Sequence, residues 1–103
     1  MSKVALVAKL TAQDGKREEL AAVLEKMYPT VEQENGTEVY AMHNDAGDPN
    51  SIWFYEVYSD DDAFGVHGSS DAMKEMFGAL GGLLAGAPEM HKLEPRRAKG
   101  VAF

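Results

Sequence analysis

The chain has 103 residues, of which 45% are hydrophobic and 26% are charged, and it contains no cysteine. This length predicts one domain spanning residues 1–103, and the lack of cysteine excludes disulfides, thiolate metal sites and a cysteine nucleophile. The formal net charge of −7 argues against nucleic acid and anionic membranes as partners, because both bind to a basic surface.

The first predicted element is a strand over residues 3–10. Its two alternating sets of side chains are both largely apolar, so we expect it to be covered on both faces. The apolar part is too short for a signal peptide or a membrane span, which together with the missing cysteines favours a cytoplasmic protein.

A helix is predicted from Arg17 to about Gln33, where apolar residues recur at helical spacing. We expect Pro29 to kink or interrupt this helix near its last turns. Gly36 is placed like a residue that ends a helix with a positive φ angle.

Strands are predicted over residues 37–44 and 51–58, paired as an antiparallel hairpin. The intervening Asp45-Ala46-Gly47-Asp48-Pro49-Asn50 is a strong turn signal. Ser59 or Asp60 is then a helix N-cap, and a short helix is expected from Asp61 to Val66 or His67.

A further helix is expected after a cap at Ser69 or Ser70, and its apolar spacing continues to Leu84. Four glycines between residues 78 and 86 weaken it. A last strand is predicted over residues 89–95, followed by a tail whose basic cluster at 96–99 is interpreted as a solvated segment.

The order of these elements, β-α-β-β-α-α-β, predicts an α+β, ferredoxin-like fold with an antiparallel sheet and helices on one face. The other face would then expose large apolar side chains to water. Dimerisation through that sheet face is the simplest way to bury them, so we predict a homodimer.

Sequence motifs on these elements resemble one known family over nearly the whole chain. They are the run 34–40, Glu-Asn-Gly-Thr-Glu-Val-Tyr, the run 53–58, Trp-Phe-Tyr-Glu-Val-Tyr, the residues Asp61, Ala63, Phe64, His67 and Ser70 that follow, and Ala87-Pro88-Glu89 before the last strand. The pattern is similar to that of the antibiotic biosynthesis monooxygenase (ABM) domain family. Its members include quinol and polyketide oxygenases that use no cofactor, haem-degrading enzymes and isomerases of signal molecules.

The resemblance implies a dimeric α+β barrel with one pocket per subunit, between the sheet and the helices. It also implies that four positions of the family's site correspond to Glu56, His67, Tyr40 and Tyr58 in this sequence. Haem degradation is disfavoured, because the first strand has no asparagine and the helix after Ser70 has no histidine.

His67 and Glu56 are the candidate catalytic residues, and each also has a structural interpretation. A histidine side chain changes its charge near neutral pH, so His67 is suited to exchanging a proton with a phenol or enol. It is equally suited to tying its helix to the sheet through a hydrogen bond to Glu56. Glu56 stands in a strand expected to be central, where a carboxylate needs a partner, and a structural ion pair is the favoured role.

Strand alternation puts Glu56 and Tyr58 on the same face of the sheet, but it does not say whether that face lines the pocket. The candidate substrate-binding residues are Tyr40, Tyr58, Phe64, Met73 and Phe77, with Met76 beside them. The apolar members are equally typical of plain core.

No metal-binding motif contains His43 or His91, and no glycine-rich phosphate loop occurs, so neither a metal nor an organic cofactor is expected. The leading hypothesis is therefore a cofactor-independent monooxygenase acting on a quinol, phenol or polyketide-like aromatic. The alternatives are an isomerase or tautomerase of a small hydroxy-ketone, and a module that binds a small ligand without turnover.

Overall fold

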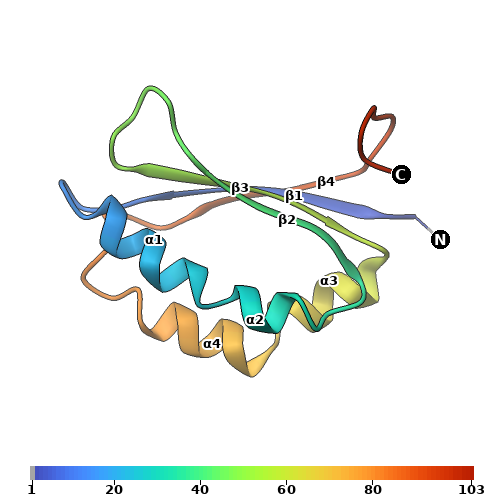
Figure 1. Cartoon of the computed structure of the whole chain (residues 1–103), viewed down its shortest axis with the longest axis horizontal. Helices are drawn as coiled ribbons and strands as arrows, with labels where there is room; N and C mark the ends of the chain where they lie inside the picture. Colours follow the sequence, from blue (N-terminus) through green and yellow to red (C-terminus); the bar gives the residue numbers. More distant parts are fainter. Residues whose placement is uncertain (1) are drawn as a thin grey trace.

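A computed structural model describes residues 2–103 and has the predicted α+β, ferredoxin-like architecture. The elements are β1 (Val4–Thr11), α1 (Arg17–Glu25), α2 (Tyr28–Val31), β2 (Thr37–Asn44), β3 (Ser51–Tyr58), α3 (Asp61–Gly68), α4 (Asp71–Gly78) and β4 (Glu89–Leu93). The strands form one antiparallel sheet in the order β2-β3-β1-β4. All four helices lie on the same face of this sheet (Figure 1).

The β2–β3 hairpin is confirmed with the predicted bounds. The Asp45 carboxylate closes its turn by accepting hydrogen bonds from the backbone amides of Gly47 (2.8 Å) and Asp48 (3.0 Å) and from Trp53 Nε1 (2.7 Å). This turn fixes the pairing register that places Tyr40 of β2 opposite Glu56 of β3. Because β3 lies between β2 and β1, Glu56 is in a central strand, as expected.

The first predicted helix is interrupted, as the position of Pro29 predicts. Helix α1 ends at Glu25 and α2 begins at Tyr28, with Pro29 in its first turn. Proline has no N–H to donate to the carbonyl of Glu25, and it is tolerated where a helix begins. The tighter turn between the helices is closed by bonds from Lys26 N to Val23 O and from Met27 N to Leu24 O, both 3.2 Å.

The last helix is shorter than predicted. Helix α4 ends at Gly78, and the expected continuation to Leu84 is wrong, because Gly82 adopts a positive φ of 83° that turns the chain. Leu84 instead forms an antiparallel bridge with Ala12, at the end of β1. The apolar spacing past Gly78 therefore reflects packing of a turn segment, of which Leu80 is only 2% exposed.

Gly36 leaves room for a close approach between two segments, and the predicted positive φ is wrong. The positive-φ glycines of residues 2–103 are Gly15, Gly82 and Gly100. At Gly36 a β-carbon would clash with the Cβ of Ala63 in α3 and lie 3.1 Å from Ser59 Oγ. The absence of a side chain at position 36 lets the α2–β2 connection approach α3 closely.

We therefore expect Gly36→Ala to lower the free energy of unfolding by about 1–3 kcal/mol, because α3 must shift to admit the methyl group. Urea denaturation measures the effect. Gly65→Ala is the matched control: Gly65 lies inside α3 and a β-carbon there meets nothing within 4 Å. Alanine is favoured over glycine in a helix by up to about 1 kcal/mol, so this control should be neutral or stabilising.

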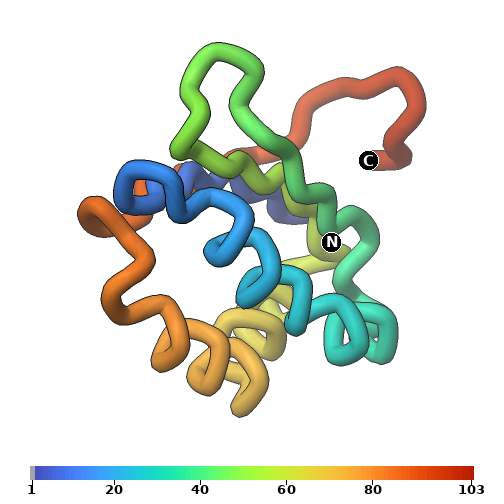
Figure 2. The backbone as a smooth tube through the Cα atoms, turned by 60° about the vertical axis from the view of Figure 1, so that its left-hand side comes forward, coloured from blue at the N-terminus to red at the C-terminus, as the bar shows by residue number. Residues whose placement is uncertain are grey.

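The core lies between the sheet and the helices. Leu20 and Leu24 of α1 are at most 1% exposed, and they pack with Ile52 and Phe54 of β3. Both termini lie at the same end of the molecule (Figure 2), where Lys3 Nζ donates a hydrogen bond to the carbonyl of Ala102 at 2.9 Å. Within residues 2–103, the helices are all too short or too polar to cross a membrane.

Candidate active site

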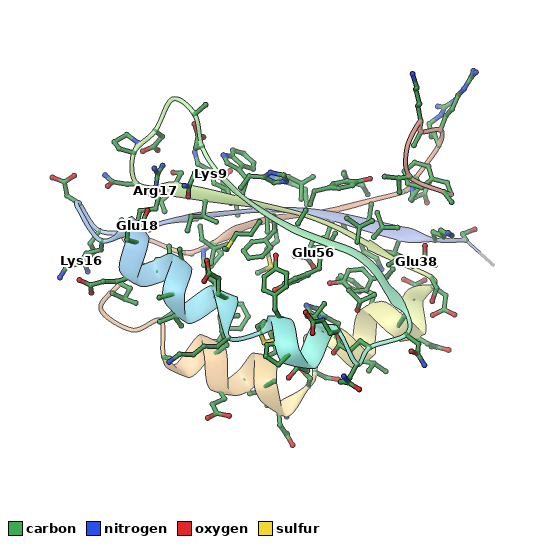
Figure 3. The ribbon with its side chains drawn as sticks, in the orientation of Figure 1. Lys9, Lys16, Arg17, Glu18, Glu38 and Glu56 are labelled. Atoms are coloured by element: carbon green, nitrogen blue, oxygen red, sulfur yellow. The ribbon has the colours of Figure 1, made fainter. Side chains whose placement is uncertain are left out.

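A cavity of about 180 Å³ lies between the helix-covered face of the sheet and helices α3 and α4. Its wall is formed by Leu6, Ala8, Leu10, Leu24, Tyr40, Phe54, Glu56, Phe64, His67, Gly68, Met73, Met76, Phe77 and Met90. The strand residues in this set share one parity of the sheet, which identifies that face as the pocket face. Figure 3 shows the Glu56 side chain on this helix side.

The mouth of the cavity lies near the edge strand β4. Met90 and Phe77 belong to the cavity wall, yet they are 51% and 39% exposed. Strand β4 has one neighbour, β1, so its outer edge is not covered by another strand. A ligand that enters between Phe77 and Met90 meets a wall that is almost entirely apolar.

The polar side chains of the wall are Tyr40, Glu56 and His67, and they are gathered at one end. The ring centroids of Tyr40 and His67 are 5.1 Å apart, and His67 Nε2 lies 4.0 Å from Glu56 Oε1. An apolar chamber with a few convergent polar groups is the usual form of a small-molecule site. The arrangement binds an apolar ring and presents proton donors and acceptors to one end of it.

His67 is held in α3 with only 4% of its surface exposed. Its Nδ1 lies 2.8 Å from Glu34 Oε1, within hydrogen-bonding distance. Its Nε2 is buried and has no hydrogen-bond partner among residues 2–103. The predicted bond to Glu56 is therefore not formed, since 4.0 Å is too long, and Glu34 takes that structural role instead.

Glu56 has a hydroxyl partner, Tyr58, rather than a cation. The Tyr58 hydroxyl donates a hydrogen bond to Glu56 Oε1, which confirms that the two side chains share a face. Burial raises the pKa of the Glu56 carboxyl above its ordinary value, although the Tyr58 hydrogen bond and the nearby His67 act in the opposite direction. The hydrogen-bond partner of Glu56 is thus a phenol, and the expected ion pair with His67 is present only as a contact at the 4.0 Å limit.

The two tyrosines carried over by the resemblance occupy different places. Tyr58 is fully buried and does not belong to the cavity wall, but it contacts the wall residues Glu56, through its hydroxyl, and His67 and Phe64, through its ring. Tyr40 does line the cavity, and burial together with the negative charge of Glu56 raises the pKa of its hydroxyl. Its phenol therefore stays protonated and able to donate a hydrogen bond.

The remaining predicted residues, Phe64, Met73, Met76 and Phe77, all belong to the cavity wall. Phe64 packs its ring edge against Tyr58, with centroids 5.3 Å apart. Within residues 2–103, histidine, cysteine and acidic side chains form no cluster of three suited to a metal ion. Sequence reasoning missed Glu34, which is 33 residues from His67 and carries no local signal of that contact.

The raised pKa of Glu56 predicts a pH dependence of stability that the variant Glu56→Gln should lack. Above the ordinary glutamate value of 4.5 the unfolded chain releases its proton before the folded chain does, so folding stability falls as pH rises. We expect the free energy of unfolding of Glu56→Gln, measured relative to the unmodified protein, to increase between about pH 4 and pH 7, by about 1.4 kcal/mol for each unit of pKa elevation. Urea denaturation at several pH values measures this difference.

Asp45→Asn is the matched control with the opposite sign. The hydrogen bond from Trp53, together with backbone amides, lowers the pKa of Asp45, so its contribution to stability is lost as pH falls through the lowered value. Relative to the unmodified protein, Asp45→Asn should therefore become less stable as pH rises. If the difference in free energy of unfolding between Glu56→Gln and the unmodified protein does not change with pH, the pKa of the Glu56 carboxyl is not raised.

Comparisons with known structures agree with this fold. The chain matches a candidate antibiotic biosynthesis monooxygenase from Caulobacter crescentus with a TM-score of 0.87 and 28% identity over 93% of this chain and 92% of that one. A second candidate of the same description, from Chloroflexus aurantiacus, gives a TM-score of 0.81 and 25% identity over 98% and 100% of the two chains. A protein from Mycobacterium tuberculosis has the same fold, with a TM-score of 0.86 and 24% identity over 94% and 98%.

No curated protein matches the sequence. The family model "Antibiotic biosynthesis monooxygenase", in contrast, matches residues 3–79, a range that contains Tyr40, Glu56 and His67. This match spans most of the chain and all the polar residues of the cavity wall. The chain therefore belongs to the antibiotic biosynthesis monooxygenase (ABM) domain family.

Proposed function

We propose that this protein is a monooxygenase of one-ring quinols or phenols, in which the substrate itself supplies the electrons for the reduction of dioxygen. The observation that carries the proposal is the cavity, an apolar chamber of about 180 Å³ whose polar side chains, Tyr40, Glu56 and His67, meet at one end. Family membership supports oxygenase chemistry, and the chamber supports the choice of substrate.

The volume favours one ring over the polycyclic aromatics. An apolar cavity of about 150 Å³ is large enough to bind benzene, so a chamber slightly larger holds one substituted ring. A tricyclic substrate that reacts at its central ring would need space on both sides of the reacting carbon. Substituents of a single ring can instead leave through the mouth beside Phe77 and Met90.

Proton transfer at the polar end would start the reaction. His67 belongs to the cavity wall and its Nε2 has no partner among the described residues, so a small movement of the buried ring would let Nε2 take a phenolic proton. The hydroxyl of Tyr40 would donate a hydrogen bond to the oxyanion that forms. The apolar wall would keep water away from this anion and from the radicals that follow.

The phenolate is electron-rich enough to pass one electron to dioxygen, and recombination of the two radicals forms a carbon–oxygen bond in a hydroperoxide. Loss of water then leaves a quinone with one added oxygen atom. For hydroquinone, one dioxygen is consumed and the products are hydroxybenzoquinone and one water. The substrate supplies all four electrons.

The test measures oxygen uptake and products with purified protein, methylhydroquinone and ¹⁸O-labelled dioxygen. We expect one dioxygen consumed per quinol and one labelled oxygen in a hydroxylated quinone, without hydrogen peroxide. Unlabelled methylbenzoquinone and peroxide, formed at the rate seen in buffer alone, would be simple autoxidation and would overturn the proposal. Naphthalene-1,4-diol and anthrone extend the panel to two and three rings, and both should react more slowly.

One observation favours a second candidate, an isomerase of a small hydroxy-ketone. Burial favours a protonated Glu56 while His67 Nε2, 4.0 Å away, is free to accept a proton. An acid and a base side by side are the groups that move a proton between adjacent carbons. Turnover of a hydroxy-ketone under strict exclusion of oxygen would favour this candidate. Tight binding with no turnover in either assay would leave a ligand-binding module.

We also propose that the protein is a homodimer formed through the face of the sheet that the helices leave uncovered. Val7, Trp53 and Tyr55 are half-buried on that face and Leu93 is 41% exposed. A second copy would remove this apolar surface from water. Light scattering should give the mass of a dimer for the unmodified protein and of a monomer for Tyr55→Glu. Lys74→Glu, on the exposed side of α4, is the control and should stay dimeric.

A further inference from the structure

We infer that Glu34 is a positioning residue for His67 that holds a proton on Nδ1 and leaves Nε2, the ring nitrogen without a partner among the described residues, as the atom that exchanges protons. Glu34 lies in the connection between α2 and β2, outside the cavity wall. The inference rests on the proposed function only for its consequence in catalysis, because the position of the proton is a property of the unliganded protein.

The hydrogen bonds of Glu34 carry the first step. Its Oε1 lies 2.8 Å from His67 Nδ1 and accepts the Thr37 hydroxyl at 3.0 Å. The side chain of Glu34 is 12% exposed and that of His67 is 4% exposed, so water competes little for this contact. An ionised carboxylate can only accept hydrogen bonds, so the Nδ1 that faces it must carry a hydrogen.

The surroundings of the ring exclude other ways of fixing the proton. The titratable groups that face His67 are Glu34, Glu56, Tyr40 and Tyr58. Glu56 Oε1 is 4.0 Å from Nε2, too far for a hydrogen bond, and it already accepts the Tyr58 hydroxyl. The two tyrosine rings contact the imidazole by ring packing, with centroids 5.1 Å and 5.3 Å away.

The consequence concerns the neutral imidazole. A histidine in water prefers the tautomer with hydrogen on Nε2, which would present a donor to the cavity. With the hydrogen held on Nδ1, Nε2 presents a lone pair, the form that a general base requires. The hydrogen bond made by one nitrogen thus decides what the other nitrogen does toward a ligand.

The test reads the tautomer directly by ¹⁵N NMR of the imidazole ring. The chain has three histidines, and replacing His43 and His91 by glutamine leaves a single signal set from His67. Both replaced residues are exposed on the uncovered sheet face, so light scattering first checks that this background has the same mass as the unmodified protein. Spectra recorded at increasing pH identify the neutral ring directly, because its two nitrogens then have distinct shifts. In this background we expect hydrogen on Nδ1. Hydrogen mainly on Nε2 would overturn the inference without any further variant.

Variants at position 34 test the cause. Glu34→Ala should move the hydrogen mainly to Nε2, whereas Glu34→Gln should keep it on Nδ1, since the amide oxygen still accepts. Glu32→Ala removes the same charge from an exposed side chain nearby and should change nothing. A Glu34→Ala protein that keeps hydrogen on Nδ1 would also overturn the inference.

Kinetics separate this inference from the proposed function. With methylhydroquinone, Glu34→Ala should lower kcat at least about 10-fold and change KM little, because replacing the carboxylate that orients a histidine base can cost up to about 10⁴-fold in kcat. The predicted tautomer in a protein that does not turn over any quinol would reject the function and keep the inference. If the unmodified protein instead has hydrogen on Nε2 and Glu34→Ala oxidises the quinol at the normal rate, the inference is rejected and the proposed function is kept.

Discussion

His67→Gln is expected to lower kcat/KM for methylhydroquinone oxidation by about 10²- to 10⁴-fold, the usual contribution of a general base. Glutamine can still donate a hydrogen bond to Glu34, so the fold of α3 should survive. It cannot accept a proton at the position of Nε2, which in the unmodified protein is buried and has no partner among residues 2–103. The initial rate of oxygen uptake with an oxygen electrode measures the loss.

Binding distinguishes a chemical role of His67 from a structural one. Methylbenzoquinone has no phenolic proton to give up, so its binding does not use His67 as a base. Its affinity should therefore change less than tenfold in His67→Gln, as expected for a residue that acts only in the transition state. His43→Gln and His91→Gln lie on the sheet face proposed to form the dimer, and variants that light scattering shows to be dimeric should react like the unmodified protein. If His67→Gln oxidises the quinol at the normal rate, His67 is a structural residue and another group is the base.

The sequence was sufficient to predict the elements whose local pattern and turn chemistry agree. The hairpin strands 37–44 and 51–58 have their predicted bounds because the turn beginning at Asp45 fixes the register between them. Apolar spacing alone was a poorer guide to the end of α4. It continues to Leu84, but Gly82 turns the chain and the residues beyond it pack against β1. Helical spacing of apolar residues indicates which side chains are buried, and a buried turn segment can show the same spacing as a helix.

The site shows where reasoning from one sequence stops. Strand alternation correctly placed Glu56 and Tyr58 on one face, because that relation is local. The partner of His67 is a tertiary relation: Glu34 comes from a loop 33 residues away, brought close only when the connection before β2 packs on α3 at Gly36. Glu56 was the more obvious carboxylate, yet its 4.0 Å separation from Nε2 depends on side-chain geometry that no spacing rule contains.

The second large effect is expected from filling the cavity. Ala8 lies at the centre of β1, is 3% exposed and belongs to the cavity wall, opposite Phe54 on one side and Met90 on the other. Ala8→Leu adds three carbon atoms to a chamber that the proposed substrate ring should nearly fill. One methylene is already worth about 10- to 200-fold in discrimination in a close-fitting pocket, so we expect the Kd for methylbenzoquinone to rise at least about 100-fold.

The same substitution should leave the protein folded, and this makes the result interpretable. The added methyl groups enter empty apolar space, and filling cavities commonly stabilises proteins by about 0.5–2 kcal/mol. Ala22→Leu, on the exposed side of α1, is the control and should change neither affinity nor stability. If a folded Ala8→Leu protein binds methylbenzoquinone normally, the ligand does not bind in this cavity. The substrate class inferred from the cavity would then be rejected. Loss of affinity with retained stability would instead locate the aromatic ring between β1, β3 and α4, with its reacting oxygen directed toward His67.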